Sequence, residues 1–135
     1  MRLFICILIF LLSASSCKKE SGLEHIEIKE VFAQHNDKYL VCFYSTTCKA
    51  CEDTIELLNR RYEIKKYRAF LVKTDDLDTN FVLKKTSNIG IRNTNEIRIY
   101  VVPYLIFINR GVIEKELFGY KEIHKENLYI FFEWK

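Results

Sequence analysis

Residues 39–51 read Tyr-Leu-Val-Cys-Phe-Tyr-Ser-Thr-Thr-Cys-Lys-Ala-Cys. The first six, Tyr39 to Tyr44, form a short apolar and aromatic run, which predicts a strand that is buried on both faces. The next three carry hydroxyl groups that can cap a helix, and a helical pattern follows through Ile55 and Leu58. The stretch therefore predicts a strand, a turn and a helix that opens at a Cys-x-x-Cys pair.

The rest of the chain surrounds this unit with further strands and helices. Apolar spacing predicts three more helices, at residues 28–35, 81–89 and 122–134. Short apolar runs predict three more strands, at residues 69–73, 103–108 and 112–118, the last two joined as a hairpin. Strands that alternate with helices before a terminal hairpin predict an α/β fold, with a mixed sheet of about four strands flanked by helices and a C-terminal helix after the hairpin.

The N-terminus has the pattern of an export signal. Arg2 precedes an apolar run from Leu3 to Leu12, which is too short for a membrane span of about 20 residues but suits a signal peptide. Small residues follow and end at Cys17, after which the chain turns polar. This pattern resembles a bacterial lipoprotein signal, although Ala14 stands where a leucine is commoner. An ordinary secretory signal cleaved near Ser16 is the alternative interpretation.

These features predict three segments along the chain. Residues 1–16 are the signal peptide, residues 17–23 are the lipidated cysteine with a polar tether, and residues 24–135 are one folded domain. Both interpretations of the signal export that domain.

Export changes the interpretation of the five cysteines. Removal of the signal discards Cys6 and lipidation occupies Cys17, which leaves Cys42, Cys48 and Cys51. An odd number rules out a purely structural set of disulfides within one chain. The loop that a Cys-x-x-Cys bridge closes is also too short to stabilise a fold strongly. The pair at positions 48 and 51 is therefore predicted to do chemistry.

Two segments resemble the thioredoxin family. Residues 40–51 are similar to its active-site strand, turn and helix, and residues 102–108 with the following glycine are similar to its cis-proline strand and hairpin. The resemblance covers residues 24–134 and implies a thioredoxin-like fold. It further implies that Cys48 is the attacking thiol and that Cys51 is the resolving thiol.

The same resemblance implies a substrate-binding surface. If the peptide bond before Pro103 is cis, the backbone of Val102 lies beside Cys48, where it can pair with an extended substrate segment. Thr47 and Lys49 flank the attacking cysteine in the sequence and belong to the same predicted surface.

Local charges around the pair oppose one another. A cysteine at a helix N-terminus is stabilised as a thiolate by unpaired backbone N–H groups. Lys49 adds to this effect, whereas Glu52 and Asp53 counteract it. The direction of electron flow therefore stays open, because it depends on the relative stability of thiolate and disulfide.

Three positions depart from the family pattern. Thr47 stands where many members have a tryptophan, and Lys49-Ala50 is neither the Gly-Pro nor the Pro-His dipeptide. Cys42 occupies the place of a buried acid that assists proton transfer. Two interpretations of Cys42 follow: a small buried core residue, or a third redox thiol that pairs transiently with the other two.

The composition points to no other kind of site. The net charge of +3 is small, and acidic and basic residues are interleaved, so we expect no nucleic-acid partner. His25, His35 and His124 are not spaced from the cysteines as metal ligands would be, so we expect no metal and no cofactor.

Together these observations predict a monomeric thiol–disulfide oxidoreductase anchored by lipid to the inner or outer membrane of a bacterial envelope, facing the periplasm. Its predicted partners are exported proteins that carry thiols or disulfides, and a membrane or periplasmic redox protein. Two alternatives stay open. The two cysteines could bind copper(I), which needs few ligands, or the fold could serve as a peptide-binding module with little turnover.

Overall fold

The computed structural model describes residues 23–65 and 68–125. The predicted signal, the lipidation site and the rest of the terminal helix lie outside the described residues. The elements in chain order are β1 (Leu23–His25), the 3-10 turn η1 (Ile28–Glu30), β2 (Lys38–Tyr44), α1 (Lys49–Lys65), β3 (Ala69–Lys73), the 3-10 turns η2 (Asp78–Asn80) and η3 (Thr94–Glu96), β4 (Tyr104–Asn109), β5 (Val112–Phe118) and α2 (Gly119–Lys125).

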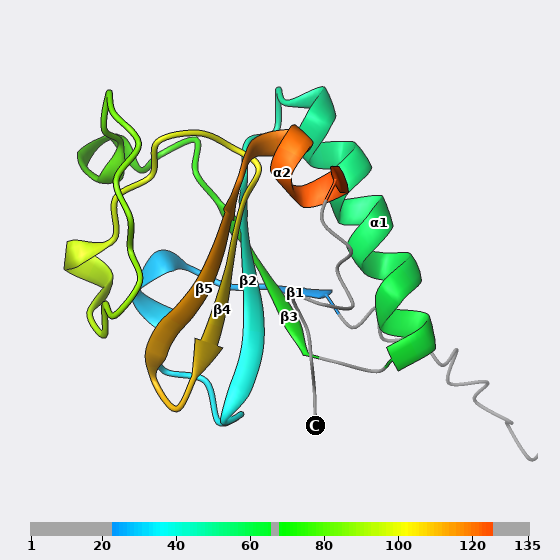
Figure 1. Ribbon diagram of the computed structural model, residues 1–135, viewed down its shortest axis with the longest axis horizontal. Coiled ribbons are helices and arrows are strands. Elements are labelled where there is room, and N and C mark those ends of the chain that lie inside the picture. The colour runs from blue at the N-terminus through cyan, green and yellow to red at the C-terminus, as the bar shows by residue number, and fades with distance from the viewer. Residues whose placement is uncertain (1–22, 66–67, 126–135) are drawn as a thin grey trace, which may run out of the picture.

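A five-stranded sheet in the order β1-β3-β2-β4-β5 forms the centre of the domain (Figure 1). Strands β1 and β2 pair with β3 in parallel, whereas β4 is antiparallel to β2 and β5 is antiparallel to β4. The predicted mixed α/β sheet with a terminal hairpin is confirmed. The additional strand is β1, which is only three residues long and too short for an alternating pattern to reveal it.

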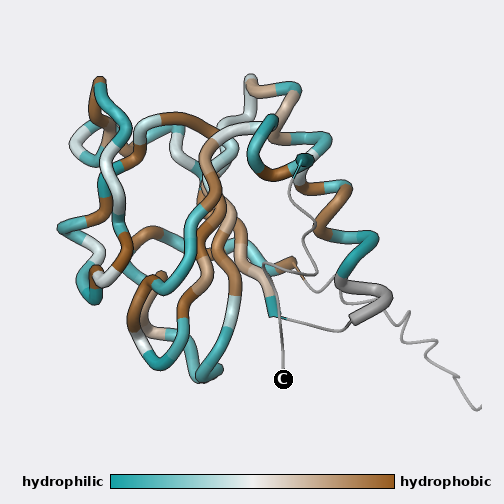
Figure 2. Tube along the Cα trace, viewed as in Figure 1, coloured by the Kyte–Doolittle hydropathy of each residue, from teal (hydrophilic) through white to brown (hydrophobic). Residues whose placement is uncertain are grey.

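Strand β2 lies in the middle of the sheet and contributes to both hydrophobic clusters. Leu40 and Cys42 belong to the cluster on the side of α1, and Val41 and Phe43 belong to the cluster on the opposite side. Five consecutive residues of this strand are buried, which confirms the predicted strand with two buried faces. Figure 2 shows the resulting hydrophobic centre along the strands, with hydrophilic chain at the ends of the molecule.

Helix α1 covers one face of the sheet together with α2 (Figure 1). Within residues 49–61 of α1, three residues have no exposed surface, Cys51, Thr54 and Leu58, and they follow one another at the i, i+3 and i+7 spacing of a single helix face. These three buried residues pack α1 against the sheet. Their packing also fixes the position of the first turn of the helix, which carries the cysteine pair.

The opposite face of the sheet is covered mainly by irregular chain. Val31 precedes β2, while Ile97 and Ile99 come from the long segment between β3 and β4, and all three are fully buried in the second cluster. In Figure 1 this segment lies to the left of the sheet, away from α1. It leads directly to the residues that lie beside the cysteine pair.

The helix predicted at residues 81–89 does not form. Phe81 makes an isolated parallel bridge to Ile99 instead, and the Val82 N–H donates to the Ile99 carbonyl at 3.0 Å. Ile89, which the helical spacing placed on the buried stripe, is 58% exposed. The Ser87 hydroxyl accepts a hydrogen bond from the Ile89 N–H, an example of the local side-chain bonding that competes with helix formation.

The helix predicted at residues 28–35 shortens to the single turn η1. The side chains of Glu27 and Glu30 cap this turn reciprocally, and the Glu27 N–H donates to Glu30 Oε2 at 2.7 Å. Val31 then becomes fully buried, and its carbonyl oxygen accepts a hydrogen bond of 2.6 Å from the Tyr39 hydroxyl. This contact binds the chain to the sheet where a helix would have continued.

The C-terminal hairpin forms as predicted. Arg110 and Gly111 both have positive φ, 49° and 74°, as a two-residue turn of type I′ requires. Helix α2 follows from Gly119, three residues before the predicted start. The Glu122 carboxylate accepts the Phe118 N–H at 2.7 Å and so closes the first turn of α2.

A buried hydrogen-bond network ties the irregular segment to the hairpin. The Tyr104 hydroxyl has no exposure; it donates to Glu116 Oε2 at 2.8 Å and accepts from Asn88 Nδ2 at 2.6 Å. The Glu116 carboxylate also accepts the Asn88 N–H and the Ser87 hydroxyl. The Asn88 side chain in turn bonds the N–H and the carbonyl of Arg98. One carboxylate thus satisfies three donors from two parts of the chain.

We predict that Glu116→Ala lowers the free energy of unfolding by about 1–3 kcal/mol, because the buried Tyr104 hydroxyl and the Asn88 N–H lose their acceptor. Urea unfolding measures the change. Glu114→Ala on the same strand removes only an exposed hydrogen bond to Asn109 and should cost about 0.5 kcal/mol or less. Equal losses in the two variants would contradict a special role for the network.

Candidate active site

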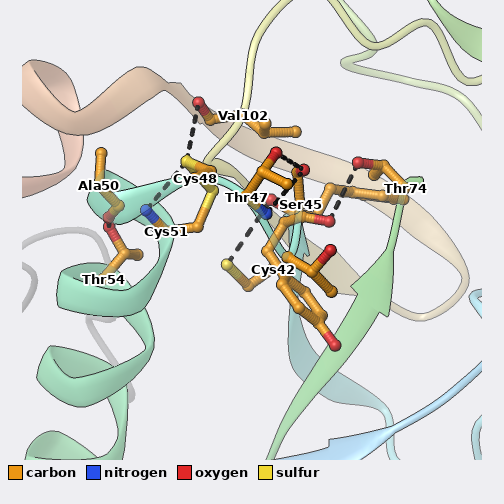
Figure 3. The surroundings of a disulfide bond; sticks show 12 residues. Cys42, Ser45, Thr47, Cys48, Ala50, Cys51, Thr54, Thr74 and Val102 are labelled. Carbon is orange, nitrogen blue, oxygen red and sulfur yellow. Dashed lines mark hydrogen bonds between the residues drawn. A yellow bond between two sulfur atoms is a disulfide. The ribbon is translucent and has the colours of Figure 1, made fainter.

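Cys48 and Cys51 form a disulfide at the start of α1, with their Cα atoms 5.2 Å apart (Figure 3). The Cys51 N–H points at Cys48 Sγ, 3.1 Å away. The two residues differ in exposure, since Cys48 is half-buried and Cys51 has no exposed surface. Of the two sulfur atoms, that of Cys48 is therefore the one within reach of another protein.

The local backbone places Cys48 at the N-cap of the helix. Its N–H donates to the Ser45 carbonyl at 3.3 Å, and its own carbonyl accepts the N–H groups of Cys51 and Glu52. The positive end of the helix dipole and the first N–H groups of α1 therefore face the Cys48 sulfur. These groups stabilise a thiolate at this position once the disulfide is reduced.

The charge of Lys49 is directed along the helix and away from the disulfide. Its ammonium group lies 3.0 Å from Glu52 Oε2 and 3.7 Å from Asp53 Oδ1. The side chains of Lys49 and Glu52 are largely exposed, and that of Asp53 is partly buried. A hydrogen bond to Glu52 and the charges of both acids raise the pKa of Lys49. These charges, one ammonium and two carboxylates, pair with one another along the helix, and the helix end is left as the main local influence on Cys48.

The segment before β4 brings a main-chain acceptor to the site. The Val102–Pro103 peptide bond is cis, and the Val102 carbonyl oxygen lies 3.9 Å from Cys48 Sγ, although 54 residues separate the two in the sequence. Figure 3 shows Val102 directly beside Cys48. The Pro103 carbonyl accepts the Gly119 N–H at 2.8 Å, which joins this segment to the start of α2.

The loop before Cys48 is held by an acid that the sequence analysis did not identify. Asp75 accepts the Thr46 hydroxyl at 2.6 Å and the Thr46 N–H at 3.3 Å. Hydrogen bonds from Thr46 and Ser45 lower the pKa of this carboxyl. Thr47 is exposed, and its hydroxyl pairs with that of Ser45 at 3.2 Å. Because β2 and β3 are parallel neighbours, the residues that follow both strands meet at one edge, and that is the signal that could have located Asp75.

Helix α2 also contacts the first turn of α1. The Thr54 hydroxyl donates to the Ala50 carbonyl at 2.9 Å, and His124 Nε2 lies 3.3 Å from the same hydroxyl. The His124 ring stacks on Tyr120, with centroids 3.9 Å apart. Ala50, one of the two residues between the cysteines, is thus linked through Thr54 to the C-terminal helix. No short-range sequence pattern marks this pairing.

Cys42 lies under the site in the hydrophobic cluster on the α1 side. It has no exposed surface, and burial raises the pKa of its thiol to about 12. Its weak donor faces the Phe43 carbonyl at 3.9 Å. The thiol is therefore neutral at ordinary pH and packs like a small apolar residue, which supports the first of the two interpretations of this cysteine.

Among the described residues, no group of three or more His, Cys, Asp or Glu side chains is arranged to hold a metal ion. His25 pairs with the Tyr44 hydroxyl and His124 with the Thr54 hydroxyl. What the site offers chemically is a pair of sulfur atoms, a helix N-terminus and a neighbouring main-chain carbonyl.

The buried Cys42 thiol makes a prediction for alkaline pH. Its folded pKa of about 12 exceeds the unfolded value of 9.0, so above about pH 9 the unfolded thiol ionises while the folded one stays neutral. In the oxidised protein this lowers the free energy of unfolding by up to about 1.4 kcal/mol per pH unit until about pH 12. Urea unfolding between about pH 8 and about pH 11 measures this change. The free energy of unfolding should fall less steeply with pH for Cys42→Ala than for wild type. Parallel curves of unfolding free energy against pH for the two proteins would contradict the raised pKa assigned to the Cys42 thiol.

Asp75 makes a prediction for the loop before Cys48. Asp75→Ala removes both acceptors of Thr46, so the amide hydrogens of Thr46 and Thr47 should exchange faster with solvent. Hydrogen exchange followed by NMR measures this change. Asp78→Ala, an exposed acid in η2, serves as the matched control and should leave both amides unchanged.

Comparisons with known proteins agree with this geometry. No family model and no curated protein matches the sequence. Among solved structures, thioredoxin f2 from Chlamydomonas reinhardtii is 15% identical, with a TM-score of 0.60 over 83% of this chain and 97% of that one. The thioredoxin pre-protein from Schistosoma mansoni is 19% identical, with a TM-score of 0.59 over 82% and 97%. Mitochondrial thioredoxin 3 from Saccharomyces cerevisiae is 15% identical, with a TM-score of 0.57 over 77% and 90%. These likenesses show that the chain has the thioredoxin fold.

Proposed function

We propose that this protein is a thiol–disulfide oxidoreductase that acts on exported proteins through Cys48 and Cys51. The observation that carries the proposal is the asymmetric cysteine pair, with the partly exposed Cys48 at the N-cap of α1 and the fully buried Cys51 one turn later. The Val102 carbonyl beside the exposed sulfur supports the docking of an extended polypeptide. The likeness of the fold to solved thioredoxins supports the same proposal.

The reaction follows from the two positions. In the reduced protein the Cys48 thiolate attacks one sulfur of a substrate disulfide, which forms a mixed disulfide and releases the other substrate sulfur as a thiolate that takes up a proton. The Cys51 thiol then loses its proton and attacks Cys48 Sγ. This step forms the Cys48–Cys51 disulfide and releases the second substrate thiolate. Two electrons pass from the protein to the substrate, and the reverse sequence oxidises a substrate dithiol.

The proposed location rests on the N-terminal sequence. Lipidation of Cys17 after removal of residues 1–16 would tether the domain to the inner or outer membrane, facing the periplasm. Within residues 23–65 and 68–125, no helix has both the length and the apolar character needed to cross a membrane. A domain anchored outside the cytoplasm would meet exported proteins as substrates, because disulfides persist in that compartment.

We predict a reversible two-thiol transition when the mature chain with Cys17→Ser is equilibrated in glutathione buffers and its free thiols are trapped with a mass tag. Cys48→Ser should abolish the transition, whereas Cys42→Ser should retain it, because that thiol is buried and neutral. A midpoint near −270 mV would identify a reductant, and one near −120 mV an oxidant. Two outcomes would contradict the proposal. Thiols masked by bound metal would favour the copper-binding alternative, and a cysteine pair that never oxidises would favour the peptide-binding alternative.

The order of attack makes a separate prediction. Cys51→Ser leaves Cys48 without its resolving partner, so mixed disulfides with exported proteins should accumulate and appear on non-reducing gels. Cys48→Ser is the matched control: it keeps one cysteine of the pair, but that sulfur has no exposed surface. Equal trapping by the two variants would refute the assigned order.

Cys17→Ala tests the proposed lipid anchor. The variant should leave the membrane fraction, because it lacks the cysteine that would be lipidated.

A further inference from the structure

A cleft of about 690 Å³ opens at the edge of the sheet where β1, β2 and β3 end. The last residue of each of these parallel strands lines it: His25 of β1, Tyr44 of β2 and Lys73 of β3. The carboxyl ends of parallel strands are a common place for ligand sites in α/β folds, and the volume falls in the range of such sites. The cleft is separate from the disulfide, and neither cysteine lines it.

The polar wall of the cleft is organised by one hydrogen bond. Tyr44 Oη lies 3.1 Å from His25 Nδ1, and the two rings meet edge to face with centroids 5.8 Å apart. This pairing fixes both rings at the mouth of the cleft. Burial and the charge of Asp75 raise the pKa of Tyr44, so the phenol stays protonated and uncharged.

The charged lining is mainly acidic. Three carboxylate side chains line the cleft, those of Glu27, Glu30 and Asp76, against one ammonium group, that of Lys73. The Glu27 carboxylate also contacts Lys29 at 2.7 Å. Asp76 is exposed. The balance of the lining is therefore complementary to a positively charged ligand.

The remaining lining is apolar. Ile26 and Ile28 come from the chain after β1, and Leu77 comes from the chain after β3. All three are partly buried side chains packed against the hydrophobic cluster on the far side from α1. Apolar lining beneath acidic side chains suits a polypeptide segment with both aliphatic and basic residues better than it suits a small inorganic cation.

The cleft is close to the disulfide along the chain. Tyr44 is four residues before Cys48, so their Cα atoms are at most about 15 Å apart, and the Ser45–Cys48 turn shortens this distance. The neighbour of Asp76, Asp75, bonds Thr46 in the loop between them. Four or five residues of an extended polypeptide are therefore enough to reach from the Cys48 sulfur to the Tyr44 side of the cleft.

We propose that this cleft binds a basic, partly apolar segment of the substrate polypeptide, four or five residues from the cysteine that Cys48 attacks. The proposal rests on the proposed function and assigns it a substrate class. Substrates with lysine or arginine beside aliphatic residues at that distance are held by the Glu27, Glu30 and Asp76 carboxylates, while the Val102 backbone aligns the segment near the sulfur. Substrates with acidic residues there are disfavoured.

The test measures binding without redox chemistry. Fluorescein-labelled peptides carry a central serine in place of the cysteine and either Lys-Leu-Lys or Glu-Leu-Glu four residues away, on either side. Their anisotropy is titrated with the oxidised mature chain carrying Cys17→Ser. At least one lysine peptide should bind about fivefold or more tightly than its glutamate counterpart, and about 1 M salt should remove the difference.

Two charge-reversal variants test whether the preference for lysine peptides arises in the cleft. Asp76→Lys should weaken the preferred lysine peptide about fivefold, whereas Asp78→Lys, an equally exposed acid outside the cleft lining, should leave it unchanged. Equal effects of the two reversals, or no preference between the peptides, would overturn the proposed cleft. Because the peptides lack a thiol, this result is independent of turnover. A redox transition without peptide preference removes only the cleft proposal. Peptide preference without a redox transition removes the oxidoreductase and leaves a cleft that binds basic peptides but serves no exchange reaction.

Discussion

The pairing of β2 on both its edges is the constraint on which the rest of the structure depends. Its parallel pairing with β3 directs α1 across one face, so the helix must start just beyond Tyr44. Its antiparallel pairing with β4 sets Phe43 opposite Tyr104, so the residues before β4 reach the same edge of the sheet. One strand therefore brings together a helix N-terminus and a main-chain carbonyl that are 54 residues apart.

The site separates the tasks of its two sulfur atoms by burial more than by charge. Cys48 is partly accessible and lies at the positive end of α1, while Cys51 belongs to the buried stripe of the helix. Lys49 is engaged by acids on its own helix. In the proposed exchange reaction, the order of the two sulfurs follows from the geometry of a single helical turn. Beneath them, Cys42 contributes packing to the cluster on the α1 side.

Short-range patterns were enough to predict the framework of the sheet. The apolar run of β2, the strands β3 to β5 and the helix opening at the cysteine pair are all encoded by neighbouring residues. The helix predicted at residues 81–89 failed because Phe81 and Asn88 are bonded to distant partners, Ile99 and Glu116. Asp75 and the Thr54–His124 contact escaped prediction for the same reason, since each joins parts of the chain that only the folded topology brings together.

The long segment between β3 and β4 has a consequence for how such proteins diverge. Buried residues such as Ile97, Ile99 and Asn88 hold it against the sheet, whereas Leu83 within it is 98% exposed. The exposed stretch around Leu83 can therefore vary while the buried residues, Pro103 and the cysteines keep their places. If the proposed exchange reaction holds, this exposed stretch is open to selection separately from the cysteine pair, so related chains could acquire new partners and keep the same reaction.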